Sequence, residues 1–199
     1  IKDCNSVGMV MVARLEWEKF ESRSLEAMRN EYEKFKLPGH TRLHLDHVPV
    51  IDEDNLRVDY MEIMRRAVAA GYESIMVDGS RLPLAENITC TRKVVEMAHA
   101  SNVPVEAELG AIMGHEAGPL PPYEELFASG EGFTDPSEAR RFVAESGVDW
   151  LSVAIGNIHG AISAAAKGKQ KVAARLSIEQ LDRIHAAANI PLVLHGGTG

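Results

Sequence analysis

Three apolar runs in this sequence each lead into a histidine, and no other feature restricts the fold as much. The runs are Thr41–Leu45, Trp150–Ile155 and Ile190–Leu194, and the histidines that follow them are His47, His159 and His195. Continuous apolar runs of this length are typical of strands that are covered on both faces, as in parallel sheets. Parallel strands present their carboxyl ends at one edge, where functional residues gather. We therefore expect the three imidazoles at one edge of a parallel sheet.

Strand-like and helix-like segments alternate along the chain. We expect strands over residues 7–13, 41–45, 74–77, 103–109, 150–155 and 190–194, and helices over residues 17–35, 56–70, 84–100, 136–146 and 178–188. Asp135 and Ser177 are predicted helix caps, because short polar side chains accept hydrogen bonds from the first N–H groups of a helix. Residues 110–132 contain many Gly and Pro and predict a lid or active-site loop.

This alternation leaves two candidate architectures, an open doubly wound sheet and a (β/α)8 TIM barrel. A doubly wound nucleotide-binding sheet carries a glycine fingerprint after its first strand, and Ala13–Glu16 contains no glycine. The sequence therefore favours the barrel, an α/β fold. Six strands are too few to close it, so we expect the first and last strand regions to be missing. Residues 1–199 would then form a single barrel domain that is incomplete at both ends.

The overall charge of the chain argues against two classes of partner. Its 199 residues carry a formal net charge of -8, so no general attraction to nucleic acid or to an anionic membrane is expected. No apolar run has the length of a membrane span. The two cysteines, Cys4 and Cys90, lack metal-binding spacing and indicate free thiols in a reducing cytoplasm.

The three strand-end histidines form a candidate metal site. Three imidazoles with an open fourth position are a ligand set of catalytic zinc. Any one of these histidines taken alone is better interpreted as structural, but a barrel brings equivalent strand ends together. His44 shares the strand parity of Asp46, and we expect it to support the site rather than to bind the metal.

Acidic residues accompany the histidines. Asp46 suits proton transfer near a metal-bound oxygen and equally suits orientation of an imidazole, so both roles stay open. Asp78 is either a site residue or a turn residue at the end of its strand. Glu106 and Glu108 lie on one side of a strand, where a charge is costly unless paired or bound to metal, so at least one should face the site. Glu116 is a mobile base in the glycine-rich loop or an ordinary surface acid.

Glycine-rich loops follow two of the histidines. They contribute Gly160, Gly196, Gly197 and Thr198. Their backbone N–H groups and one hydroxyl are suited to hold a phosphate group, and barrels often place phosphate at such loops.

Seven short motifs occur along the chain in an order that is specific enough to compare with known families. They are His44-Leu-Asp-His47, Met76-Val-Asp-Gly-Ser80, Leu84-Ala-Glu-Asn-Ile88, Val105-Glu-Ala-Glu-Leu-Gly110, Phe133-Thr-Asp-Pro136, Ala154-Ile-Gly-Asn-Ile-His-Gly160 and Leu192-Val-Leu-His-Gly-Gly-Thr-Gly199. Together they resemble the class II, zinc-dependent fructose-bisphosphate and tagatose-bisphosphate aldolases, from about Arg42 onward. The resemblance implies a (β/α)8 barrel that is a homodimer or homotetramer.

The resemblance also implies a role for each candidate residue. His47, His159 and His195 would hold the catalytic Zn²⁺, and Asp78 and Glu108 would bind it, or a second metal, in an alternative site. Asp46 would be the acid/base at the C4 hydroxyl. Glu116 would move the proton at the dihydroxyacetone phosphate carbon. The phosphate loop would be formed by Gly160, Gly196, Gly197 and Thr198, where Thr replaces the commoner Ser, with a monovalent cation (Na⁺ or K⁺) nearby in some family members.

The implied activity is a lyase reaction, the reversible cleavage of a ketose (bis)phosphate such as fructose 1,6-bisphosphate. Its products would be dihydroxyacetone phosphate and an aldehyde such as glyceraldehyde 3-phosphate. Zinc would act as a Lewis acid where other aldolases use a Schiff-base lysine. Two other functions stay open: a metal-dependent hydrolase or isomerase on a similar barrel, and a non-catalytic barrel that binds phosphorylated sugars.

Overall fold

The computed structural model describes residues 5–18, 22–110, 123–157 and 175–196. The chain divides into two compact units, residues 1–107 (unit 1) and residues 108–199 (unit 2), and each is described by itself. Both units are built from parallel strands and helices, as the sequence predicts.

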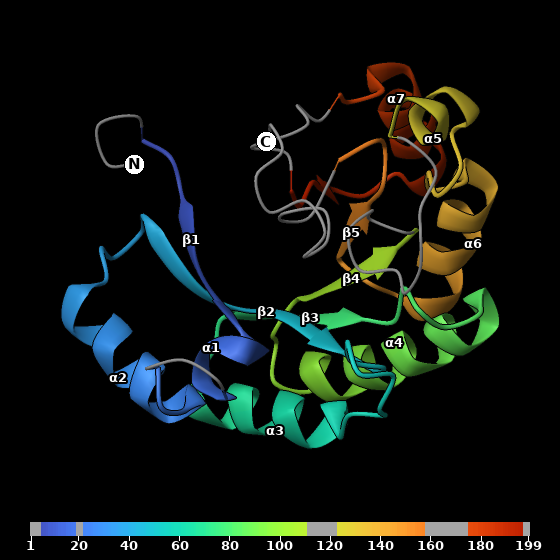
Figure 1. Ribbon diagram of the computed structural model, residues 1–199. Helices are drawn as coiled ribbons and strands as arrows, with labels where there is room; N and C mark the ends of the chain where they lie inside the picture. The colour runs from blue at the N-terminus through green and yellow to red at the C-terminus, as the bar shows by residue number, and fades with distance from the viewer. Residues whose placement is uncertain (1–4, 19–21, 111–122, 158–174, 197–199) are drawn as a thin grey trace, which may run out of the picture. The chain divides into compact units, whose positions relative to one another are not determined.

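Unit 1 alternates strands with helices. Its elements are β1 (Gly8–Ala13), α1 (Arg14–Glu18), α2 (Leu25–Phe35), β2 (Thr41–Pro49), α3 (Tyr60–Ala70), β3 (Ser74–Asp78), α4 (Leu84–His99) and most of β4 (Val105–Leu109). Strands that follow each other in the chain pair in parallel, β1 with β2, β2 with β3, and β3 with β4. Helices α2, α3 and α4 lie in one row along one side of these strands (Figure 1). This is the βαβ repeat in which helices cover a parallel sheet.

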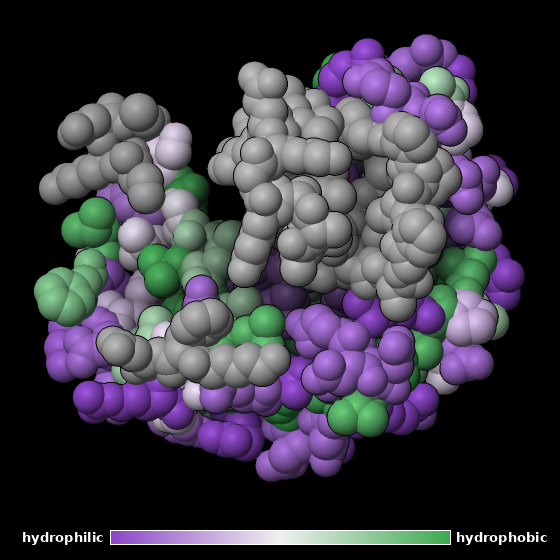
Figure 2. Space-filling view, viewed as in Figure 1, coloured by the Kyte–Doolittle hydropathy of each residue, from purple (hydrophilic) through white to green (hydrophobic). Residues whose placement is uncertain are grey.

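The apolar residues of the central strands of unit 1 are buried, as expected for strands that are covered on both faces. Leu43 and Leu45 in β2 and Ile75 and Val77 in β3 have no exposed surface. Burial of a side chain of this size stabilises a fold by about 1.5–3 kcal/mol. The helices turn charged residues outward, and hydrophilic residues predominate along the lower margin of Figure 2, where α2 and α3 lie.

Two helix boundaries in unit 1 differ from the prediction. The single helix expected over residues 17–35 is two helices, because the backbone at Arg23 takes a positive φ of 67° that no helix residue adopts. The Ser24 hydroxyl then caps α2 by accepting a hydrogen bond from the Ala27 N–H at 3.1 Å. Helix α3 starts at Tyr60, behind the cap Asp59, rather than at Leu56.

Unit 2 contains short strands between helices. Its elements are α5 (Tyr123–Ser129), α6 (Pro136–Ser146), β5 (Trp150–Val153), α7 (Ile178–Ala188) and β6 (Leu192–Val193). Strands β5 and β6 pair in parallel, and α6 packs on α7. The caps predicted at Asp135 and Ser177 are confirmed, since their side chains accept hydrogen bonds from the first N–H groups of α6 and α7.

Helix α5 was not expected, because it lies in the segment that predicts an irregular loop. Within the described parts of the chain, no helix combines the length and the apolar character that crossing a bilayer requires.

Candidate active site

The carboxyl end of β2 carries an extra residue where Asp46 and His47 lie. Between the pairs Leu45–Ile75 and Val48–Val77, β2 advances three positions while β3 advances two. This is a β-bulge, which redirects side chains and is frequent beside active sites. The backbone at His47 has a φ of 41°, a conformation that is costly for a residue with a Cβ atom. The strand predicted to end at Leu45 therefore continues to Pro49 through a strained step at the predicted site.

His47 faces the carboxylate of Asp78, which ends the neighbouring strand β3. The Nδ1 atom of His47 lies 4.0 Å from Oδ2 of Asp78, and both side chains keep about a fifth of their surface exposed. The other carboxylate oxygen, Oδ1, accepts hydrogen bonds from the backbone N–H of Ser80 at 2.9 Å and from its hydroxyl at 2.6 Å. Ser80 thus fixes the Asp78 carboxylate, with Oδ2 toward the imidazole. An imidazole nitrogen and a carboxylate oxygen at this separation are donors that suit zinc.

His44, which precedes these residues on β2, lies inside the sheet of unit 1. Its Nδ1 atom is 2.7 Å from the hydroxyl oxygen of Ser74 on β3. Its Nε2 atom is 3.5 Å from Oε2 of Glu106 on β4 and 4.0 Å from Oδ1 of Asp46. His44, Ser74 and Glu106 are buried, so none of them reaches a substrate. They form a polar cluster next to Asp46.

In unit 2, Glu108 is buried in β4 and Gly110 follows the strand with a φ of 101°. The chain after β4 is held by Thr134, whose hydroxyl donates to the carbonyl of Leu109 at 2.5 Å. The hydroxyl oxygen of Thr134 also accepts a hydrogen bond from the N–H of Ala154, just past β5, at 2.8 Å. Thr134 therefore joins the ends of two strands in unit 2.

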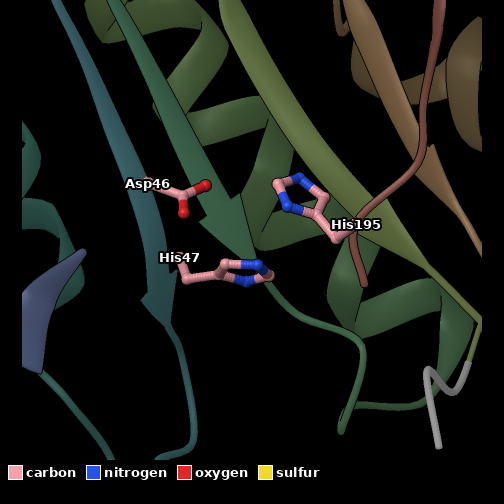
Figure 3. A group of neighbouring side chains, drawn as sticks. All are labelled: Asp46, His47 and His195. Carbon is pink, nitrogen blue, oxygen red and sulfur yellow. The ribbon is translucent and has the colours of Figure 1, made fainter. Parts of the chain in front are cut away.

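His195 follows β6 in unit 2 and is buried. Its backbone carbonyl accepts a hydrogen bond of 2.7 Å from the side-chain amide of Asn157, which follows β5. Asn157 is not among the predicted site residues, because its burial and its contact with His195 become visible only in the fold. Figure 3 draws Asp46 and His47 on β2 and His195 on the chain that follows β6.

Several predicted site residues lie outside the described parts of the chain. They are Glu116, His159, Gly160, Gly197 and Thr198. Gly196 is described and has a φ of 64°, in the region that favours glycine.

The family model of fructose-bisphosphate aldolase class-II matches residues 1–199 of this sequence. The chain belongs to this family. A fructose-bisphosphate aldolase of Staphylococcus epidermidis is 37% identical over 157 residues, which are 79% of this chain and 46% of that protein. A fructose-bisphosphate aldolase of Staphylococcus aureus is 36% identical over the same shares. The chain spans about half the length of the curated relatives it matches.

A solved structure supports the fold. The crystal structure of the YdjI aldolase from Escherichia coli K12 superposes with a TM-score of 0.70 at 28% identity, over 99% of this chain and 60% of that one. The fold class expected from the sequence, an α/β barrel of which this chain holds consecutive parallel βα units, is confirmed, and so is the family resemblance.

Proposed function

We propose that this chain is part of a class II aldolase that reversibly cleaves a ketose (bis)phosphate such as fructose 1,6-bisphosphate. The products would be dihydroxyacetone phosphate and an aldehyde such as glyceraldehyde 3-phosphate. The observation that carries the proposal is the strained bulge of β2, which sets Asp46 and His47 at a strand end beside the oriented carboxylate of Asp78. We further propose that residues 1–199 belong to one barrel domain, and that the enzyme is a cytoplasmic homodimer or homotetramer.

The proposed metal is Zn²⁺, held by His47, His159 and His195. The donor chemistry of the described residues fits this ion, because an imidazole nitrogen and a carboxylate oxygen lie 4.0 Å apart at His47 and Asp78. Asp78 and Glu108 are proposed to bind the metal in an alternative or second position. When bound, zinc would act as a Lewis acid that stabilises the negative charge left at C3 when the C3–C4 bond breaks.

Two acids are proposed to move protons. Asp46 takes the proton from the C4 hydroxyl as the bond breaks and returns it in the reverse direction, and Glu116 transfers the proton at C3 of dihydroxyacetone phosphate. A well-placed acid or base contributes about 10²–10⁴-fold in rate. The polar cluster of His44, Ser74 and Glu106 supports this proposal, because its contacts attach β2, the strand that carries Asp46, to β3 and β4.

The substrate phosphate is proposed to bind at Gly160, Gly196, Gly197 and Thr198, with Na⁺ or K⁺ nearby. Backbone N–H groups in glycine-rich loops satisfy phosphate oxygens without side-chain bulk. The positive φ of Gly196 is compatible with such a loop.

The test is an assay of the protein, loaded with zinc, against a panel of ketose phosphates. We expect release of dihydroxyacetone phosphate, measured by coupled reduction, and loss of that release with a chelator. Hydrolysis without triose phosphate release would support the hydrolase or isomerase instead. Phosphate binding without zinc binding would support a non-catalytic phosphosugar-binding barrel.

A further inference from the structure

The side chain of Asn157 forms hydrogen bonds to the backbone just beyond the last residue pair of β5 and β6. The ladder pairs Leu151 with Leu192 and Ser152 with Val193. Beyond the last pair, the Nδ2 group of Asn157 donates to the carbonyl of Val153 at 3.2 Å and to that of His195 at 2.7 Å. One amide thus joins the end of β5 to the chain that leaves β6.

The hydrogen-bonding groups of this amide are all used inside unit 2. Its Oδ1 atom accepts a hydrogen bond from the N–H of Ile155 at 2.8 Å, while Nδ2 serves the two carbonyls. Only 1% of the residue is exposed, so water does not replace these contacts. Asparagine supplies two donors and an acceptor in one plane, whereas an isosteric aspartate supplies no donor when ionised.

The backbone at Gly156, which precedes Asn157, is closely packed. Gly156 has a φ of 104°, and a Cβ atom added there would lie 2.4 Å from the carbonyl oxygen of Arg175 and 2.6 Å from Cε2 of Phe127. Asn157 therefore follows a tightly packed position of the chain. The amide that holds the backbone of His195 is thus attached to a closely packed part of unit 2.

We propose that Asn157 is a positioning residue for metal binding, which holds the backbone of His195 against the end of β5. The inference rests on the proposed function, because it takes His195 as a metal ligand. Metal sites require ligand atoms placed within about 0.2 Å, and loss of a group that orients a ligand typically costs 10–100-fold in metal affinity.

The test compares zinc affinities of the full chain, measured by competition with a chromophoric chelator. We expect Asn157→Asp to weaken zinc binding about 10–100-fold, because a carboxylate repels the two carbonyls that the amide held. Asn157→Ser keeps one hydroxyl donor, serves if the first variant does not fold, and should give a smaller loss. Phe142→Leu is the matched control: Phe142 is buried in α6 of the same unit, so the variant should lower the melting temperature and leave zinc affinity unchanged.

The outcomes distinguish a failure of the positioning role from a failure of the proposed metal binding. If the wild type binds zinc and the folded Asn157 variants bind it equally well, the positioning role is wrong while the proposed function stands. A loss of affinity in Phe142→Leu as large as in Asn157→Asp also overturns it, because the effect would then follow general stability. A wild type that binds no zinc overturns the metal assignment and this inference together. A second readout is turnover at saturating zinc, which should recover in Asn157→Asp if the residue acts through metal binding.

Discussion

The Nδ1 atom of His44 lies 2.7 Å from the hydroxyl oxygen of Ser74, in the interior of the parallel sheet of unit 1. With Glu106 at 3.5 Å from the opposite ring nitrogen, the three residues have the composition of a hydrolytic triad. All three are almost fully buried, so no substrate reaches the Ser74 hydroxyl. The arrangement does not support a serine hydrolase; it anchors the end of β2 that carries Asp46.

His44→Gln tests this anchoring. The variant loses the ring that links Ser74 and Glu106, and it should lower the free energy of unfolding by about 1–3 kcal/mol, the cost of disturbing buried polar partners. Urea denaturation measures the change. His185→Gln is the control, because His185 is exposed on α7 and surface changes stay within about 0.5 kcal/mol. Equal effects of the two substitutions would contradict a structural role for the buried cluster.

Asp46→Asn tests the proton-transfer role. The amide has the size of the carboxylate but does not accept the C4 hydroxyl proton, so kcat should fall by about 10²–10⁴-fold. Zinc content should stay at the wild-type level, which metal analysis of the purified variant checks. Asp54→Asn, at an exposed acid in the loop after β2, should leave kcat unchanged. Turnover retained in Asp46→Asn would remove this residue from the mechanism.

Removal of the metal should lower stability as well as activity. A ligand that binds only the folded state stabilises it by about 2.7 kcal/mol at a hundred times its dissociation constant. We therefore expect zinc to raise the melting temperature of the wild type and a chelator to reverse the gain. In His47→Ala the gain should be much smaller, because one proposed ligand is absent. A zinc-dependent rise of equal size in His47→Ala would mean that the ion binds elsewhere.

Local sequence signals predicted the elements that depend on local physics. Continuous apolar runs located β2 and β3, and the caps at Asp135 and Ser177 were placed correctly because each side chain satisfies N–H groups within three residues. The break before α2 had a signal that went unused, since Ser24 is a favourable cap inside the segment expected to be helical.

Features that depend on pairing between distant segments could not be predicted in this way. The bulge at His47 arises from the register of β2 against β3, and no local pattern encodes a one-residue slip between two strands. Helix α5 is short, and its Phe127 packs edge-on against Phe133 with ring centroids 5.6 Å apart, so its formation depends on tertiary contacts. The role of Asn157 has no local signal, because its partner, the carbonyl of His195, is 38 positions away.

The cap of α6 gives a prediction with a defined pH dependence. The Ser137 hydroxyl, which donates to the Asp135 carboxylate, and the backbone N–H of Glu138 lower the pKa of that carboxyl below its ordinary value of 3.8. A carboxyl whose pKa is lower in the folded state stabilises the fold above the unfolded pKa, and the contribution is lost as pH falls through the folded pKa. Asp135→Ala should therefore cost about 1 kcal/mol near neutral pH and less below about pH 3.8.

Ser177→Ala supplies the matched control for this pH dependence, because Ser177 caps α7 in the same unit with a hydroxyl that does not titrate. Urea denaturation of both variants and of the wild type across the acid range gives the two differences in unfolding free energy. The cost of Ser177→Ala should stay constant, since a hydroxyl accepts the Gln180 N–H at every pH in that range. If the cost of Asp135→Ala is equally constant, the carboxylate charge adds nothing to the cap, and Asp135 acts only as a neutral acceptor would.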